Sequence, residues 1–161
     1  MHSVMQYLNL SCCNNEQAIL SDICRMETAG LITKQQAESV DTGRIFRFFQ
    51  TDLGQKLISS KEILREFKFS ILDDASKYYE DVRDDYILLQ GVIDCALVEN
   101  EGITVIDFKT DYITEDNLDE KIEHYQMQVS TYANALEKIY QKPVIAAYIY
   151  FFSCEKLICI H

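Results

Sequence analysis

The chain has 161 residues, the length of one domain with one sizeable core, and its 48% hydrophobic and 25% charged residues are ordinary for a globular protein. The longest apolar runs, such as residues 144–152, are too short to span a bilayer as a helix, and the first residues do not form a secretory signal. The net charge of −11 excludes a domain that holds nucleic acid through a general positive field, although a bound metal ion can supply positive charge locally. We therefore expect a cytoplasmic protein without membrane contact.

The six cysteines indicate neither a zinc ribbon nor a disulfide framework. No two of them are spaced as C-x-x-C, and two are adjacent in the sequence. Several lie among apolar residues, where a free thiol behaves as a small hydrophobic side chain, so we expect reduced thiols. The residues are Cys12, Cys13, Cys24, Cys95, Cys154 and Cys159.

The first sixty residues have the pattern of helices. Residues 15–29 form the first clear helical stretch, which Gly30 ends, and Asp41-Thr42-Gly43 offers a start for the next one. From residue 44 to residue 58 the apolar side chains recur roughly on one helical face. This spacing predicts one amphipathic helix over residues 44–58.

Strand-like sequence, rich in β-branched and aromatic residues, begins near Ile63 and returns over residues 86–98, 103–109, 144–152 and 157–160. One long helix, residues 114–141, interrupts these strands. Thr114 is a suitable N-cap, Glu115 and Asp116 suit the first turn, and Lys142-Pro143 closes the far end. The order predicts a mixed α/β fold in a single domain, with a central mixed sheet flanked by helices and an N-terminal helical segment over residues 1–60.

Two carboxylates and one ammonium lie in the most hydrophobic part of the chain. Asp94 belongs to one central strand, Asp107 to the next, and Lys109 follows two residues later. Residues 99–102 form the turn between these strands. A buried charge is costly unless it is paired or bound to a metal, so packing alone does not explain three charges together. We interpret them as a functional site.

The pairing across this turn predicts a metal ion. If Val98 pairs with Ile103, Asp94 lies directly opposite Asp107, and like charges in opposed positions repel one another. Lys109 points to the same face as Asp107, but one lysine cannot neutralise two carboxylates, whereas a divalent cation can. Hard oxygen ligands with open positions favour Mg²⁺, for which Mn²⁺ can substitute. The alternative is a structural Asp107–Lys109 pair, with Asp94 at a bulge.

The long helix carries a second group of polar residues. Tyr125, Gln128 and Tyr132 have the spacing i, i+3 and i+7, so they share one face of the helix. A glutamine embedded among apolar side chains needs hydrogen-bond partners, and the end of the neighbouring hairpin offers them. The alternative, which the spacing alone favours slightly, is an amphipathic helix whose tyrosines belong to the core.

Two further features of the sequence suggest ordinary solvated residues. Glu66, on the first strand, could approach the carboxylates, but a solvated strand position is the simpler interpretation. The acidic segment over residues 80–85 follows Tyr78 and Tyr79 and has the pattern of an exposed loop.

Three motifs resemble those of the RecB-like nucleases of the PD-(D/E)xK superfamily. They are Gly91-Val92-Ile93-Asp94, Ile106-Asp107-Phe108-Lys109 and Tyr125-x-x-Gln128-x-x-x-Tyr132. Within that family the sequence looks most like the C-terminal nuclease domain of AddA-type (RexA-type) helicase–nuclease subunits. The opening residues 1–6 are similar to the helix that carries a metal-binding histidine in that family, and residues 150–153 resemble the end of that domain.

The resemblance implies a restriction-endonuclease-like fold and hydrolysis of DNA phosphodiester bonds at a divalent metal ion. By motif match, the metal ligands would be His2, Asp94, Asp107 and the main-chain carbonyl of Phe108. Lys109 would be the catalytic lysine, and Gln128 and Tyr132 would support the site or the DNA.

The resemblance also implies a setting in the repair of double-strand breaks. AddA-type subunits have a large helicase region ahead of the nuclease domain and work with an AddB-like (RexB-like) subunit, so we expect this chain to be a fragment of a larger subunit with those partners and with DNA. The cysteines do not match the four-cysteine iron–sulfur pattern of AddB-type and Cas4-type nucleases, and no cluster is expected. Two alternatives stay open: an inactive scaffold or DNA-binding module within a repair complex, and an isolated exonuclease that acts without a helicase.

Overall fold

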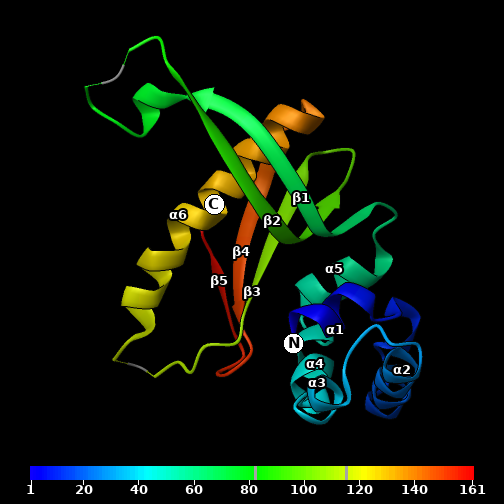
Figure 1. The fold of residues 1–161 in the computed structure, drawn as a ribbon. Coiled ribbons are helices and arrows are strands. Elements are labelled where there is room, and N and C mark those ends of the chain that lie inside the picture. Colours follow the sequence, from blue (N-terminus) through cyan, green and yellow to red (C-terminus); the bar gives the residue numbers. More distant parts are fainter. Residues whose placement is uncertain (82, 115) are drawn as a thin grey trace.

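The computed structural model in Figure 1 describes residues 1–81, 83–114 and 116–161. Within these ranges, five short helices are followed by three strands, a long helix and two more strands, in the predicted order. The helices are α1 (His2–Tyr7), α2 (Glu16–Thr28), α3 (Lys34–Glu38), α4 (Thr42–Phe49), α5 (Asp52–Ser59) and α6 (Leu118–Tyr140), with 3-10 turns η1 (Leu10–Cys12) and η2 (Ala75–Lys77). The strands are β1 (Ile63–Asp74), β2 (Tyr86–Val98), β3 (Ile103–Lys109), β4 (Val144–Phe151) and β5 (Lys156–Cys159).

The five strands form one mixed sheet in the order β1-β2-β3-β4-β5. Antiparallel pairing joins β1 to β2, β2 to β3 and β4 to β5, whereas β3 and β4 are parallel. The parallel pair needs a long crossover connection, and α6 provides it. The mixed α/β fold predicted from the sequence is confirmed.

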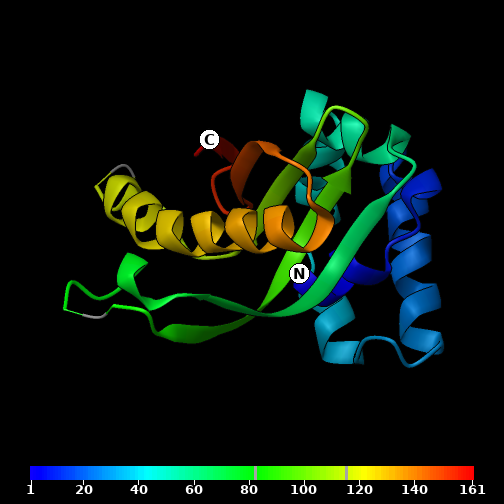
Figure 2. The same ribbon diagram turned by 90° about the horizontal axis from the view of Figure 1, so that it is seen from above.

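Helices cover both faces of the sheet, as the view from above in Figure 2 shows. On one face, helices α1, α2, α4 and α5 pack against Leu97, Ile106 and Tyr150. On the other face, α6 packs against Ala96, Val105 and Ile149. The central strand β3 is therefore buried on both faces, and any polar group on it must find partners inside the protein.

The paired strands β1 and β2 change faces at one position. Side chains two residues apart on a strand share a face, yet Cys95 packs with the N-terminal helices and Ile93 packs with α6. On β1 the corresponding position is Glu66, which adopts a φ of 50°, a left-handed conformation rare for a residue with a side chain. Asp94 thus lies where the ribbon turns, and the strain at Glu66 marks that place.

The predicted helix over residues 44–58 is wrong in one respect, because the structure divides it. Helix α4 ends at Phe49, and α5 starts again after Thr51, whose hydroxyl accepts the N–H of Gly54 at 3.0 Å. The start of α5 lies against the end of α4: a side chain at Gly54 would collide with the backbone of Phe48 and Phe49. The chain therefore folds back here and does not continue as one helix. The apolar spacing continues across the break and conceals it.

The start of the long helix also differs from the prediction. Helix α6 begins at Leu118, not at Thr114, and the N–H of Thr114 donates to Oδ1 of Asn117 at 2.8 Å. Glu115, expected in the first turn, lies outside the described residues. At the other end, Gln141 adopts a left-handed conformation and Lys142-Pro143 follows, as predicted. The predicted helix over residues 15–29 is confirmed, with Asn15 as the N-cap of α2 and Gly30 after its end.

Buried Asp73 at the end of β1 joins the β1–β2 ribbon to α6. Its carboxylate accepts hydrogen bonds from Lys77, Tyr78, Asn134 and Lys138, so it is fully paired. The described residues of the segment after it form the expected exposed loop: Tyr78 and Tyr79 are both exposed, although the Tyr78 hydroxyl donates to Asp73.

All six cysteine thiols are free, and Cys13 and Cys95 lie in the core. None of the helices in the described part of the chain combines the length and apolarity needed to cross a membrane.

Gly91 allows β1, β2 and α6 to approach closely. A Cβ atom at this position would lie 2.7 Å from Cε1 of Phe69 and 3.4 Å from Cε1 of Tyr132. We expect Gly91→Ala to lower the free energy of unfolding by about 1–3 kcal/mol, because the Phe69 ring must leave its place against α6. Urea unfolding measures the loss, with Gln90→Ala at the neighbouring exposed position as the matched control. Equal stability of the two variants would contradict this packing.

Candidate active site

Asp107 and Lys109 lie together on β3, on the face covered by α6. Lys109 Nζ is 2.9 Å from Oδ2 of Asp107, and only 1% of Asp107 is exposed. Although the two groups are within ion-pair distance, neither oxygen of Asp107 has a hydrogen-bond partner in the described structure. Burial raises the pKa of the Asp107 carboxyl, against the opposing charge of Lys109. Buried oxygens without hydrogen bonds are rare and call for an explanation.

Asp94 approaches this pair from β2. Its Oδ2 accepts the backbone N–H of Phe108 at 2.8 Å. Burial, and next the charge of Asp107, raise the pKa of the Asp94 carboxyl to about 6. Two carboxylates therefore share a poorly hydrated place beside Lys109, whose single charge does not neutralise both.

The predicted register is correct as far as the ladder runs. Val98 pairs with Ile103, and pairing continues to Cys95 and Ile106. The ladder ends there, one position before the two aspartates. Continued by one position, this register sets Asp94 opposite Asp107, so the opposed placement stays a prediction, and the Asp94 side chain accepts the N–H of Phe108.

His2 reaches the same place from the first turn of α1. Its Nε2 donates to the carbonyl oxygen of Phe108 at 2.6 Å and lies 3.6 Å from Oδ2 of Asp94. The histidine side chain is 43% exposed, whereas that of Asp94 is 15% exposed. The structure thus brings together all four groups that the resemblance suggests as metal ligands, from α1, β2 and β3.

These groups fit a hard divalent cation. The described residues contain no group of three His, Cys, Asp or Glu side chains placed to hold a metal ion, so a site here would need the Phe108 carbonyl as a further donor. The two oxygens of Asp107, which accept no hydrogen bond, are available as donors to a cation. Carboxylate and carbonyl oxygens with one imidazole suit Mg²⁺ or Mn²⁺.

Gln128 links Lys109 to Tyr132. Its Oε1 accepts from Lys109 Nζ at 3.0 Å, and its Nε2 donates to the Tyr132 hydroxyl at 2.5 Å. Lys109 Nζ also lies 4.2 Å from the centroid of the Tyr125 ring. Tyr125 and Tyr132 both contact the core, as the alternative proposed, yet the face that they share with Gln128 also contacts the lysine.

Glu66 lies closer to the site than the sequence suggested. Arg65 pairs with Cys95 and Phe67 with Ile93, which puts Glu66 at the register position of Asp94. Glu66 is half-buried, and whether it is only an ordinary solvated residue stays untested. Only its left-handed backbone conformation marks it, and no pattern in the sequence indicates that.

An open groove of about 570 Å³ lies beside Gln128 and Tyr132, between the β1–β2 ribbon and α6. Its lining contains no Asp, Glu, Lys or Arg, in a chain with a net charge of −11. The lining residues are Phe69, Gln90, Gly91, His124, Met127, Gln128, Thr131 and Tyr132.

The site thus consists of two carboxylates and a lysine on a strand hairpin, with Gln128 and Tyr132 of α6 beside them. Residues 1–157 match the family described as the PD-(D/E)XK nuclease superfamily. The chain belongs to this superfamily, which confirms the resemblance seen in the sequence.

The curated relatives are described as the A-type subunits of ATP-dependent helicase/nucleases. The relative from Oceanobacillus iheyensis is 36% identical over 98% of this chain and 13% of its own length. The relative from Acetivibrio thermocellus is 40% identical over 94% of the chain and 12% of its own length, and that from Bacillus cytotoxicus is 36% identical over 99% and 14%. The chain thus spans only 12–14% of the length of these relatives.

Among solved structures, one described as "Crystal structure of SSO0001" has a TM-score of 0.44 and 14% identity, over 93% of this chain and 62% of that one.

Proposed function

We propose that this chain hydrolyses DNA phosphodiester bonds in a reaction that depends on Mg²⁺, with Mn²⁺ as a substitute. The observation that carries the proposal is the buried Asp107 carboxylate, whose oxygens accept no hydrogen bond although Lys109 lies within ion-pair distance of one of them. A structural ion pair would have its oxygens hydrogen-bonded, because an unsatisfied buried carboxylate costs stability. Membership of a nuclease superfamily supports the same chemistry.

The residues that would hold the metal ion are His2, Asp94, Asp107 and the carbonyl of Phe108. A divalent cation bound there polarises a phosphate group and lowers the pKa of a water molecule. Asp94 is fixed for this role by the Phe108 N–H, and Asp107 is fixed by its place on the central strand.

Lys109 would orient the attacking water or stabilise the charge that develops on the pentavalent phosphorus. Its ammonium is held from three sides, by Asp107, by Gln128 and by the Tyr125 ring. A lysine held in this way does not reorganise during the reaction, which is what electrostatic stabilisation of a transition state requires. Gln128 and Tyr132 act through Lys109 as positioning residues.

The neutral groove beside Gln128 is the proposed approach for a DNA strand. Its lining carries no carboxylate that would repel phosphate, and it includes Gln128, which accepts a hydrogen bond from Lys109. The acidic surface elsewhere would bind DNA only weakly, so we propose that other protein regions deliver the DNA to this domain. These are an AddB-like partner protein and the helicase region of the same polypeptide, in the cytoplasm, during the processing of double-strand breaks.

Incubation of the purified chain with end-labelled single-stranded and double-stranded DNA tests the proposal. We expect cleavage with Mg²⁺ or Mn²⁺ and none with EDTA. With Ca²⁺ in place of Mg²⁺, a gel shift at low salt separates binding from cleavage. An inactive scaffold would bind the metal ion or DNA and leave the DNA intact under all of these conditions.

Gln128→Ala removes the acceptor that fixes Lys109 and the donor to Tyr132. We expect kcat to fall about 10- to 100-fold, the usual effect of losing a partner that orients a catalytic group, with an unchanged Mg²⁺ requirement. The matched control is Gln126→Ala, an exposed glutamine on the same helix. Steady-state kinetics at several Mg²⁺ concentrations measure both quantities. Equal kcat in the two variants would show that Gln128 has no role in positioning.

A further inference from the structure

Helix α1, which carries His2, is too short to hold its own conformation. It has six residues, and no side chain caps its N-terminus. An isolated helix of this length is unstable in water. The place of His2 therefore depends on what holds α1 against the rest of the protein.

Apolar packing supplies part of that support. Val4, Met5 and Leu8 are buried against the N-terminal core. Such contacts fix the helix on the protein, but they are not directional, so they do not by themselves set its rotation or its position along its axis.

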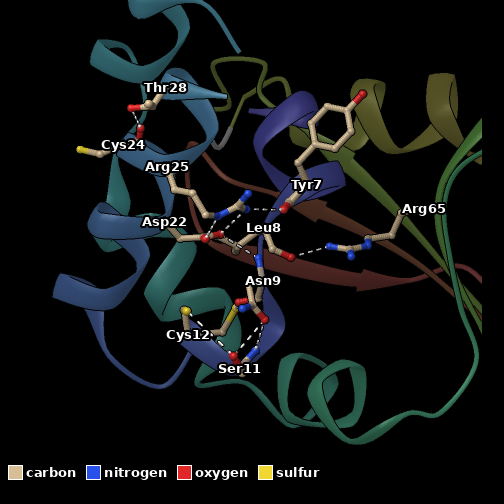
Figure 3. A network of polar contacts seen from close by, with 11 residues as sticks. Tyr7, Leu8, Asn9, Ser11, Cys12, Asp22, Cys24, Arg25, Thr28 and Arg65 are labelled. Atoms are coloured by element: carbon tan, nitrogen blue, oxygen red, sulfur yellow. Dashed lines mark hydrogen bonds and ion pairs between the residues drawn. The ribbon is translucent and has the colours of Figure 1, made fainter. Parts of the chain in front are cut away.

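Arg65 supplies directional contacts at the far end of α1. Its Nη1 donates to the carbonyl of Leu8 at 2.7 Å (Figure 3) and to that of Met5 at 3.3 Å. These carbonyls belong to the last turn of the helix, where no backbone partner remains. Arg65 lies on β1 and pairs with Cys95, the residue directly after Asp94. One residue thus connects the helix of His2 to the strand of Asp94.

A second arginine completes the support. Arg25 Nη2 donates to the carbonyl of Tyr7 at 3.4 Å, and Oδ2 of Asp22 accepts the N–H of Asn9 at 2.8 Å (Figure 3). Arg25 and Asp22 are themselves paired, and the Arg25 contact lowers the pKa of the buried Asp22 carboxyl. These contacts anchor α1 to α2, whereas the Arg65 contacts reach the sheet that carries Asp94 and Asp107.

We propose that Arg65 is a positioning residue for His2, which it aligns with Asp94 by holding the end of α1 to β1, and that it thereby sets the affinity of the site for a divalent cation. The proposal rests on the proposed function in one respect, namely that His2 is a metal ligand. Arg65 lies outside the metal-ligand motifs, because it contacts the carbonyls of Met5 and Leu8 and none of the proposed ligand atoms.

The test is a double-mutant cycle read out by the binding of Mn²⁺ alone, measured by electron paramagnetic resonance. We expect Arg65→Ala to weaken Mn²⁺ binding about tenfold, as loss of an outer partner of a metal ligand does. In a His2→Ala background the same substitution should have no further effect, since Arg65 acts through His2. An equal loss of affinity in both backgrounds, or no loss in either, would overturn the proposal.

Two further variants keep the result interpretable. Arg44→Ala, which removes an arginine paired with Asp41 on the surface, should leave Mn²⁺ affinity unchanged. Arg65→Lys keeps one donor and should give an intermediate affinity; it takes the place of Arg65→Ala in the cycle if the alanine variant does not fold by circular dichroism.

Amide hydrogen exchange gives a readout independent of metal. In Arg65→Ala we expect faster exchange in α1 and unchanged exchange in β2 and β3, and faster exchange throughout would mean a general structural role. The nuclease proposal fails separately: a wild-type chain that binds Mn²⁺ but cleaves no DNA would reject nuclease activity and leave the role of Arg65 intact. A wild-type chain that binds no Mn²⁺ would overturn the role of Arg65 in metal binding.

Discussion

Asp107→Ala and Lys109→Ala should each abolish Mg²⁺-dependent cleavage of DNA while leaving the fold intact. Asp107 is the most buried carboxylate of the site, and Lys109 is the only ammonium beside it in the described structure. Removing one preorganised electrostatic partner from such a site costs about 10²–10³ in kcat, and losing a metal ligand adds to that. We therefore expect at least about a thousandfold loss in each variant, measured by single-turnover cleavage of end-labelled DNA.

Exposed residues of the same type provide the controls. Asp119→Ala in the first turn of α6 and Lys68→Ala on β1 remove the same charges away from the site, and both should retain activity. Circular dichroism and urea unfolding confirm that each variant is folded. Undiminished Mg²⁺-dependent degradation by both Asp107→Ala and Lys109→Ala would exclude these residues from catalysis.

The second large effect concerns the stability of the metal-free protein. In an unfolded chain Asp94 loses its proton near the ordinary pKa of 3.8, whereas the folded chain keeps it up to about pH 6. Below about pH 4 both states are protonated. Between those values folding takes up a proton, so the free energy of unfolding falls as the pH rises. Above pH 6 the free energy of unfolding has fallen by its full amount, about 3 kcal/mol, since each pKa unit corresponds to about 1.4 kcal/mol.

Asp94→Asn removes this titrating group together with its interaction with Asp107, and leaves the titrating groups away from the site unchanged. The amide oxygen still accepts the N–H of Phe108, but no charge is buried beside Asp107. We expect the variant to match the wild type near pH 4 and to be more stable by about 3 kcal/mol at pH 7–8 without metal, as urea unfolding measures. Saturating Mg²⁺ should stabilise the wild type and not the variant, because a ligand stabilises only the state that binds it. A difference that does not change with pH would contradict the burial of a charged Asp94.

Much of the fold follows from local patterns in the sequence. The order of the strands, the turn at residues 99–102 and the pairing of Val98 with Ile103 were predictable, because alternation and turn residues are local signals. The ends of helices were less predictable. The break between α4 and α5 depends on the close approach of Gly54 to Phe48, a tertiary contact that apolar spacing does not reveal.

The site was predictable where charges interrupt an apolar strand. Asp94, Asp107 and Lys109 stand out for that reason, and the structure brings them together with Gln128. His2 came from resemblance alone, because a histidine near a terminus carries no physical signal. Glu66 was considered but interpreted as a solvated residue, because its left-handed backbone leaves no pattern in the sequence. Arg65 was not identified, since its contacts span about sixty positions of sequence.

Diffraction from crystals soaked in Mn²⁺, recorded at a wavelength where manganese scatters anomalously, tests the central claim most directly. We expect an anomalous peak beside the carboxylates of Asp94 and Asp107, within ligand distance of the Phe108 carbonyl. The same peak should be absent from Asp107→Ala crystals treated identically. No peak at this position in crystals of a wild-type chain that cleaves DNA with Mn²⁺, or a peak at another place only, would contradict the assignment of this hairpin as the metal site.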